Sequence, residues 1–276
     1  MTLAWHLNRW TGAALDALLA PFRGLPPAVG LAFVSAVAAA GMLLLFRATS
    51  DQTRLARTKR LIHAAILEIR LFNEHPRLVV SAQGEVLRQT FRYFGLTLAP
   101  LLWLALPVLV LMSHLHARYG HRALEVGEAA IVSVAVEDVR ALAGALALEV
   151  DGGVRVETPP LAIPTLGEAA WRVVGLREGD HELRVRLGDE VIGKTVSVAG
   201  SARRLSRRRP GPGLLDQALA PSEPPIPRGS AVAAVEVRYP PADVALFGWR
   251  THWVVAFLVF TLAAALLLRG PLRVTF

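Results

Sequence analysis

The sequence predicts an α-helical membrane protein with three transmembrane helices, a cytosolic helical hairpin and an inserted extracytoplasmic all-β domain of the Ig-like sandwich kind. Hydrophobic residues make up 53% of the 276-residue chain, which is more than an ordinary soluble domain carries. Three apolar runs without Asp, Glu, Lys or Arg are long enough to cross a bilayer. Between the second and third runs, hydrophobicity alternates with a period of two, as in strands that bury one face.

Residues 1–26 predict an amphipathic helix on the outer side of the membrane. One stripe recurs at helical spacing: Leu3, Leu7, Trp10, Ala14, Leu18 and Phe22. Tryptophan suits the headgroup region, but a helix packed on protein explains the stripe equally well. A signal peptide fits poorly, because the first long apolar run begins only after Pro26.

The three apolar runs are predicted spans. Residues 27–46 are rich in small side chains, which let helices approach closely in lipid, and at about 1.5 Å per residue they cover a hydrocarbon core of about 30 Å. Residues 96–112 contain Pro100 and Pro107, which predict a kink. Residues 252–268 form the third span, with Trp253 and Arg269 as interfacial anchors.

The charge distribution predicts the orientation of these spans. Basic residues cluster after the first span and before the second: Arg47, Arg54, Arg57, Lys59, Arg60, Arg88 and Arg92. Only Arg9 and Arg23 precede the first span. By the positive-inside rule, residues 47–95 are cytosolic, the N-terminus is outside and the tail 269–276 is inside. We expect a multi-pass protein of a bacterial or archaeal cytoplasmic membrane, that is, the cell inner membrane.

The basic segment 47–95 predicts a helical hairpin of the coiled-coil kind. A narrow apolar seam precedes a break at Pro76, and a second helical pattern follows it. The first seam consists of Leu55, Ile62, Ala65, Ile69 and Phe72, and the second pattern consists of Leu78, Val79, Ala82, Val86, Phe91 and Phe94. A basic segment beside membrane spans more often contacts anionic lipid than nucleic acid, so we expect no nucleic-acid partner.

Residues 122–246 predict the β-domain. Strand patterns occupy residues 131–136, 169–174, 182–187, 191–198 and 233–239, with a turn at 188–190. Short strands with Gly and Pro between them favour a sandwich. The Pro/Gly-rich stretch 210–228 is predicted to be a mobile loop or linker.

The sequence predicts no covalent chemistry. The chain has no cysteine, which excludes a thiolate nucleophile and a Cys-based zinc site. Serine-hydrolase, phosphate-loop and dinucleotide patterns are absent, so we expect neither enzyme activity nor a cofactor. His114, His116 and His121 stand near Glu125 in a spacing that matches no standard metal motif. Interfacial histidines are the commoner reading, and no metal site is expected.

Two groups of polar residues are candidates for binding. Within the runs the polar residues are few: Ser35, Thr97, His252 and Thr261, with Arg47 at the cytosolic edge. Arg47 is a functional candidate, although snorkelling to the surface explains it as well. The second group is a basic patch: Arg203, Arg204, Arg207, Arg208 and Arg209. This patch suits lipid phosphate or an acidic partner, and also a solvated loop without a partner.

The order of these elements resembles the YidC/Oxa superfamily of membrane insertases, in its three-span branch with archaeal YidC-like proteins and the insertase subunit of the ER membrane complex. The matching parts are residues 27–46, the sequence Arg47-Ala48-Thr49-Ser50-Asp51-Gln52, residues 88–112 and residues 252–276. The resemblance implies a chaperone that inserts client membrane proteins through a groove between three spans and the hairpin. The β-domain is extra to this layout.

Under this resemblance, the polar groups of the groove are Arg47, Gln52, Gln89, Ser35, Thr97 and Thr261. Its implied partners are membrane lipid, nascent membrane proteins, the ribosome or translocon, and an accessory subunit. The alternative is a non-catalytic envelope protein whose β-domain binds an extracytoplasmic partner while the hairpin only anchors or signals.

Overall fold

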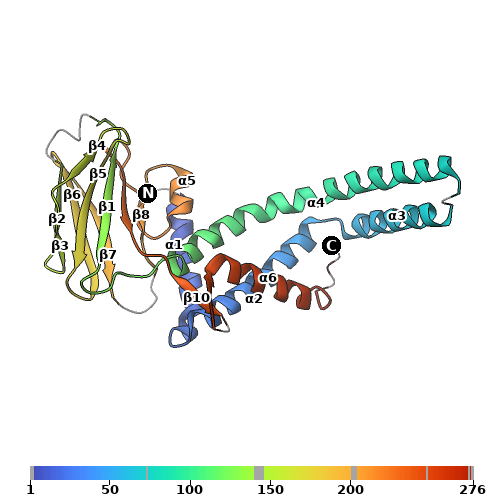
Figure 1. Cartoon of the computed structure of the whole chain (residues 1–276), viewed down its shortest axis with the longest axis horizontal. Helices are drawn as coiled ribbons and strands as arrows, with labels where there is room; N and C mark the ends of the chain where they lie inside the picture. The colour runs from blue at the N-terminus through green and yellow to red at the C-terminus, as the bar shows by residue number, and fades with distance from the viewer. Residues whose placement is uncertain are drawn as a thin grey trace. The chain divides into compact units, whose positions relative to one another are not determined.

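The computed structural model describes residues 3–72, 74–139, 146–199, 204–246, 248–272 and 274. The chain divides into two compact units (Figure 1). Unit 1 comprises Met1–Leu31 and Leu109–Ala256, and unit 2 comprises Ala32–Val108 and Phe257–Phe276. Unit 1 contains the strands, and unit 2 is helical in the part that is described. The predicted combination of long apolar helices with a β-domain is confirmed at this level.

Unit 1 is built around antiparallel sheets. The larger sheet has the order β3-β5-β1-β9-β8, with β4 paired to β5. Its strands are β1 (Ala129–Val136), β3 (Val154–Val156), β4 (Leu161–Ile163), β5 (Glu168–Gly175), β8 (Arg208–Arg209) and β9 (Val232–Arg238). The second sheet has the order β2-β6-β7, with β2 (Leu146–Val150), β6 (Gly179–Leu187) and β7 (Glu190–Val198). A separate hairpin joins β10 (Asp243–Leu246) to β11 (Trp249–His252).

The two larger sheets share one hydrophobic core, which makes the domain a sandwich. Val132 of β1 and Trp171 of β5 belong to the same buried cluster as Leu183 of β6 and Val196 of β7. Burial alternates along β6, as the period-two pattern predicts. The β6–β7 turn has Gly188 at a φ of 60°, a backbone region that glycine adopts without steric cost.

Gly175 lies where the two sheets approach closely, so a side chain added there should destabilise the sandwich. A Cβ atom at Gly175 would lie 2.6 Å from Cγ2 of Val198 on the opposite sheet. We expect Gly175→Ala to lower the free energy of unfolding by about 1–3 kcal/mol through overpacking, measured by denaturant unfolding of the full chain in detergent. The control is Gly84→Ala on a helix, where nothing lies within 4 Å. Equal stability of the two variants would contradict the close approach of the sheets.

The helices are α1 (Leu3–Leu19), the short 3-10 helix η1 (Ala20–Phe22), α2 (Pro27–Thr49), α3 (Gln52–Leu71), α4 (Pro76–Tyr119), α5 (Leu214–Leu219) and α6 (Trp253–Leu268). By length and composition, α2 and α4 are able to cross a membrane, whereas α6 is a shorter apolar helix of 16 residues. The three predicted spans are therefore matched by two long apolar helices and a short one. His252 ends β11, so the third apolar helix begins one residue later than predicted.

The second arm of the predicted hairpin and the second predicted span are one helix. α4 runs for 44 residues through Pro100 and Pro107. Each proline removes one backbone donor, but neither ends the helix. Pro76 occupies its first position, where a missing N–H costs nothing. α3 begins after Asp51, whose carboxylate accepts a hydrogen bond of 3.0 Å from the Arg54 amide as an N-cap.

Two segments of unit 1 differ from the simplest sequence reading. In α1, Leu7 and Trp10 of the apolar stripe are exposed, while Asn8 and Leu15 form the buried side. The stretch 210–228, predicted to be a mobile loop, contains α5 and packs on the sandwich. Ile226 of this stretch is 2% exposed and belongs to the hydrophobic core, so part of the predicted loop packs against the sandwich.

Candidate functional site

The helical hairpin of unit 2 closes along a narrow seam. Leu55 and Ala65 of α3 and Ala82 of α4 are buried, and so are the polar residues Thr58 and Gln89. Spacings of three and seven residues place them on one face of each helix. Leu55 also belongs to a buried cluster in which residues of α2, α4 and α6 take part. The hairpin therefore joins the apolar helices in one packed body.

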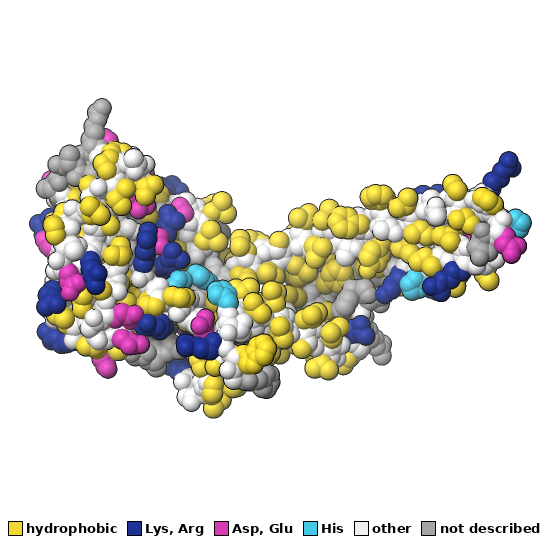
Figure 2. Space-filling model, in the orientation of Figure 1, with side chains coloured by type: hydrophobic (Ala, Val, Ile, Leu, Met, Phe, Trp, Pro, Cys, Tyr) yellow, Lys and Arg dark blue, Asp and Glu magenta, His cyan; other side chains and the backbone are white. Residues whose placement is uncertain are grey.

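The aromatic residues predicted for the seam lie outside it. Phe72, Phe91 and Phe94 are 45%, 74% and 63% exposed. Phe91 follows the buried Gln89 by two positions, which is about 200° around a helix, so it points away from the seam. Leu87 is also 60% exposed. Figure 2 shows hydrophobic side chains along the visible surface of the long helices. The hairpin thus presents an apolar surface that its own unit leaves uncovered.

Arg47, a predicted groove residue in the last turn of α2, contacts the C-terminal segment. Nη1 of Arg47 donates a hydrogen bond of 3.0 Å to the carbonyl oxygen of Leu272. The Arg47 side chain is exposed. Gln52 is the first residue of α3, and its side chain lies outside the described part.

The other predicted groove residues differ in the hydrogen-bond partners of their polar atoms. Nε2 of Gln89 donates to Oε1 of Glu85 at 2.8 Å, while its own Oε1 is buried with no partner among the described residues. Thr97 donates to the Tyr93 carbonyl of its own helix at 2.6 Å. Ser35 is fully buried in α2. A second buried oxygen without a described partner belongs to Thr261 of α6.

The arginines of the predicted basic patch contact different groups of unit 1. Arg207 forms an ion pair of 2.7 Å with Glu236, and Nε of Arg209 donates to the carbonyl oxygen of Pro224 at 3.2 Å. Arg208 is exposed on β8. Arg203 lies outside the described residues. Arg207, Arg208 and Arg209 therefore differ in their contacts.

Arg204 leaves this stretch and joins a cluster on α1. Its Nη1 lies 3.6 Å from Asp16, and Arg118 of α4 also pairs with Asp16. Gly12 gives Arg204 room, because a Cβ there would lie 2.8 Å from its Cζ atom. The sequence did not indicate this cluster, since its members are far apart in the chain.

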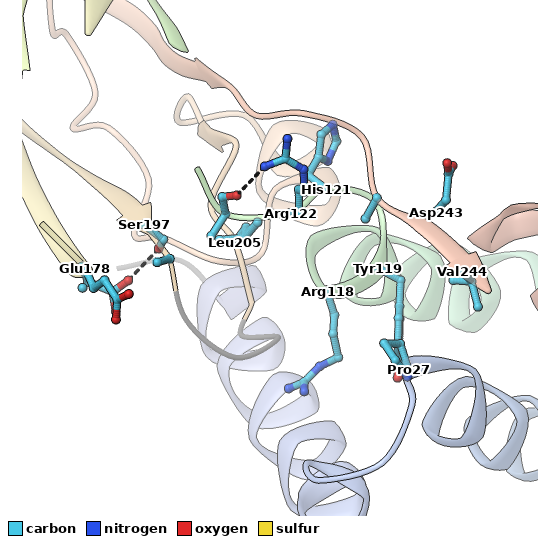
Figure 3. A pocket seen from close by; sticks show the side chains of 15 residues that line it. Pro27, Arg118, Tyr119, His121, Arg122, Glu178, Ser197, Leu205, Asp243 and Val244 are labelled. Atoms are coloured by element: carbon cyan, nitrogen blue, oxygen red, sulfur yellow. Dashed lines mark hydrogen bonds between the residues drawn. The ribbon is translucent and has the colours of Figure 1, made fainter. Parts of the chain in front are cut away.

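A cavity of about 450 Å³ separates the end of α4 from the sandwich and the β10 strand (Figure 3). Arg118 and Arg122 contribute positive charge to its wall, while Asp180 and Asp243 contribute negative charge. Asp180 accepts a hydrogen bond of 2.6 Å from Ser197. Because the charges are mixed, the cavity carries no field of a single sign.

The three histidines predicted as a group divide into two environments. His114 is 2% exposed and its Nε2 lies 2.8 Å from Oγ1 of Thr11. His116 and His121 stack edge to face, with ring centroids 5.0 Å apart. No three of the described His, Asp and Glu side chains come together in a way suited to a metal ion.

The partly buried His121 makes the stability of the fold depend on pH. Burial, helped by nearby His116, lowers the pKa of His121 from 6.5 to about 4. Between these values the unfolded chain binds a proton that the folded chain does not, so stability falls as the pH drops from about 6.5 to 4. We expect His121→Gln to lose less thermal stability between pH 7 and pH 4.5 than the parent. The exposed His63→Gln serves as control, and identical pH profiles of all three proteins would contradict the assignment.

A lysine and a serine that are distant in sequence meet inside the sandwich. Nζ of Lys194 donates to Oγ of Ser206 at 3.0 Å and pairs with Glu223 at 3.0 Å. Burial lowers the pKa of Lys194, and Glu223 opposes that shift. A lysine acting as a general base must be neutral and accept the serine proton. Here Lys194 donates and faces a carboxylate, so the pair is structural.

Comparison with known proteins adds no relative: no family model, curated protein or solved structure matches the chain.

Proposed function

We propose that this protein is an insertase-like membrane protein that assists the insertion or folding of client membrane helices. The observation that carries the proposal is the exposed apolar surface of the α3–α4 hairpin, exemplified by Leu87 and Phe91. Large apolar patches on a protein surface mark sites that bind a partner or lipid. The second arm of the hairpin is the first part of α4, and the apolar part of α4 follows it. In this proposal the exposed surface therefore lies beside the route into the membrane.

The apolar helices support a membrane location. Trp103 and Leu106 of α4 are 69% and 67% exposed, and Leu262 and Leu267 of α6 are 63% and 77% exposed. Exposing such side chains to water costs about 25 cal/mol per Å² of apolar surface. Lipid around α2, α4 and α6 removes that cost. In this proposal the hairpin is cytosolic and the sandwich lies outside, as the basic residues beside the spans predict.

Polar groups of unit 2 are the ones that this proposal assigns to contact with polar client segments. Gln89 and Thr261 each hold a buried oxygen without a described partner. A polar group in hydrocarbon costs several kcal/mol unless it is hydrated or paired. Groups of this kind lower the cost for a client polar segment that passes beside them. Arg47, at the end of α2, supplies a charged group at the same unit's edge.

Reconstitution tests the proposal. The purified full chain is placed in liposomes, and a short single-span protein is synthesised in their presence. We expect more protease-protected client than in protein-free liposomes of the same lipid composition. Equal protection in both would refute the insertase proposal and favour the anchoring role.

A further inference from the structure

A second cavity of unit 1, of about 510 Å³, is strongly basic on one side. Arg23, Arg118 and Arg204 line it, and Asp16 is the one carboxylate among its lining residues. Residues 200–203, which precede Arg204, contain no Asp or Glu in the sequence. Three arginines and one carboxylate thus line the cavity, which leaves it with an excess of positive charge.

Two of these arginines are held inside the unit. The Arg118 side chain is 9% exposed and the Arg204 side chain 20% exposed. Both contact Asp16, yet the Nε atom of each is buried with no hydrogen-bond partner among the described residues. Buried charge is costly unless it is paired and hydrogen-bonded. The cluster therefore holds two buried donors without a described partner, and the residues that line the cavity carry a net positive charge.

The fold fixes the position of both guanidinium groups. Arg118 stands in the last turn of α4 and extends toward α1 (Figure 3). Arg204 donates to the carbonyl oxygen of Pro221 at 3.0 Å and rests against Gly12. Donors fixed in this way lose less entropy when they bind an anion than flexible surface arginines do.

The other side of the cavity is apolar. Leu19, Phe22 and Leu25 line it, together with the first turn of α2 at Pro27. α2 is a helix long and apolar enough to cross a membrane, so the end of α2 belongs at the level of lipid headgroups. Its N-terminus also carries the positive end of the helix dipole.

We propose that this cavity binds the phosphate of an anionic phospholipid headgroup, with the acyl chains lying along the apolar side. Guanidinium groups bind phosphate oxygens through paired hydrogen bonds, and basic pockets beside membrane helices suit lipid headgroups. Arg118 and Arg204 hold the phosphate, and Arg23 adds positive charge at the exposed edge. This inference does not depend on the insertase proposal.

Binding to the delipidated full chain in detergent tests the site. The probes are dihexanoyl phosphatidylglycerol, dihexanoyl phosphatidylcholine and inorganic phosphate, each titrated by calorimetry. We expect phosphatidylglycerol to bind most tightly, and Arg204→Gln to weaken it about tenfold, as the loss of a charged hydrogen bond implies. Arg204→Gln keeps the Arg118–Asp16 pair, and Gly12→Ala, which displaces the Arg204 guanidinium, is expected to act in the same direction.

The control variant is Arg208→Gln, which removes the same charge from an exposed position on β8 outside this cavity. Unchanged phosphatidylglycerol affinity in Arg208→Gln is the expected result. Equal weakening in Arg204→Gln and Arg208→Gln would show a general charge effect and overturn the site. Binding of inorganic phosphate that depends on Arg204, without tighter binding of the lipid, would overturn the assignment to a phospholipid.

Discussion

Glu223→Gln is expected to lower the free energy of unfolding of unit 1 by about 3–5 kcal/mol, because it leaves a buried lysine without its counter-charge. The side chains of Lys194 and Glu223 are 0% and 10% exposed, and their charged atoms lie 3.0 Å apart. Glu223 also accepts a hydrogen bond of 2.8 Å from the amide of Thr195. Thermal unfolding of the full chain in detergent measures the effect, and we expect a fall of roughly 6 °C or more.

The exposed pair Glu182–Arg184 provides a matched control in the same sandwich. Its atoms are also 3.0 Å apart, but both side chains are more than half exposed. Exposed pairs contribute about 0–1 kcal/mol, so Glu182→Gln should change stability little. If Glu223→Gln were as mild as Glu182→Gln, Lys194 would not be the buried cation described here.

Phe91→Asp is expected to reduce client insertion about tenfold or more while leaving the fold intact. Phe91 is 74% exposed, so its replacement removes little packing within the protein. Burying an aromatic side chain against a client helix contributes about 1.5–3 kcal/mol, and an aspartate at that position adds the cost of desolvating a charge. The reconstituted insertion reaction measures the loss.

Leu161→Asp is the control for this substitution. Leu161 is 64% exposed on β4 of the sandwich, so the same chemical change falls on a surface that the proposal does not assign to clients. We expect unchanged insertion for Leu161→Asp. Full activity of Phe91→Asp would contradict a role for the hairpin surface in client contact.

Local patterns predicted much of this fold. Alternating hydrophobicity placed β1, β6 and β7, because a strand with one buried face repeats every two residues. The apolar composition of residues 27–46 likewise placed most of α2. The hairpin was placed by its three- and four-residue spacing, although Phe91 and Phe94 were assigned to the wrong face because hydrophobicity alone does not distinguish a seam from an exposed apolar surface.

Those local patterns could not predict side-chain contacts between residues that are distant in the sequence. Arg204 was grouped with its neighbours in sequence, whereas the fold brings it to Asp16, 188 positions away (204 − 16). Lys194 of β7 meets Ser206, which precedes β8, and Glu223, which lies in the Pro-rich stretch after β8. Such contacts depend on tertiary packing, which neither composition nor spacing encodes. By contrast, the predicted span 96–112 already contained Pro100 and Pro107, and α4 runs through both prolines as one helix.

Site-specific photo-crosslinking tests the central claim most directly. A photoreactive phenylalanine analogue replaces Leu87 on the hairpin or Leu161 on the sandwich, and ribosomes then synthesise a short membrane protein beside membranes that contain each variant. If the hairpin surface contacts clients, we expect an adduct between the nascent chain and position 87, and none at position 161. Absence of an adduct at position 87, or equal adducts at both positions, would contradict it.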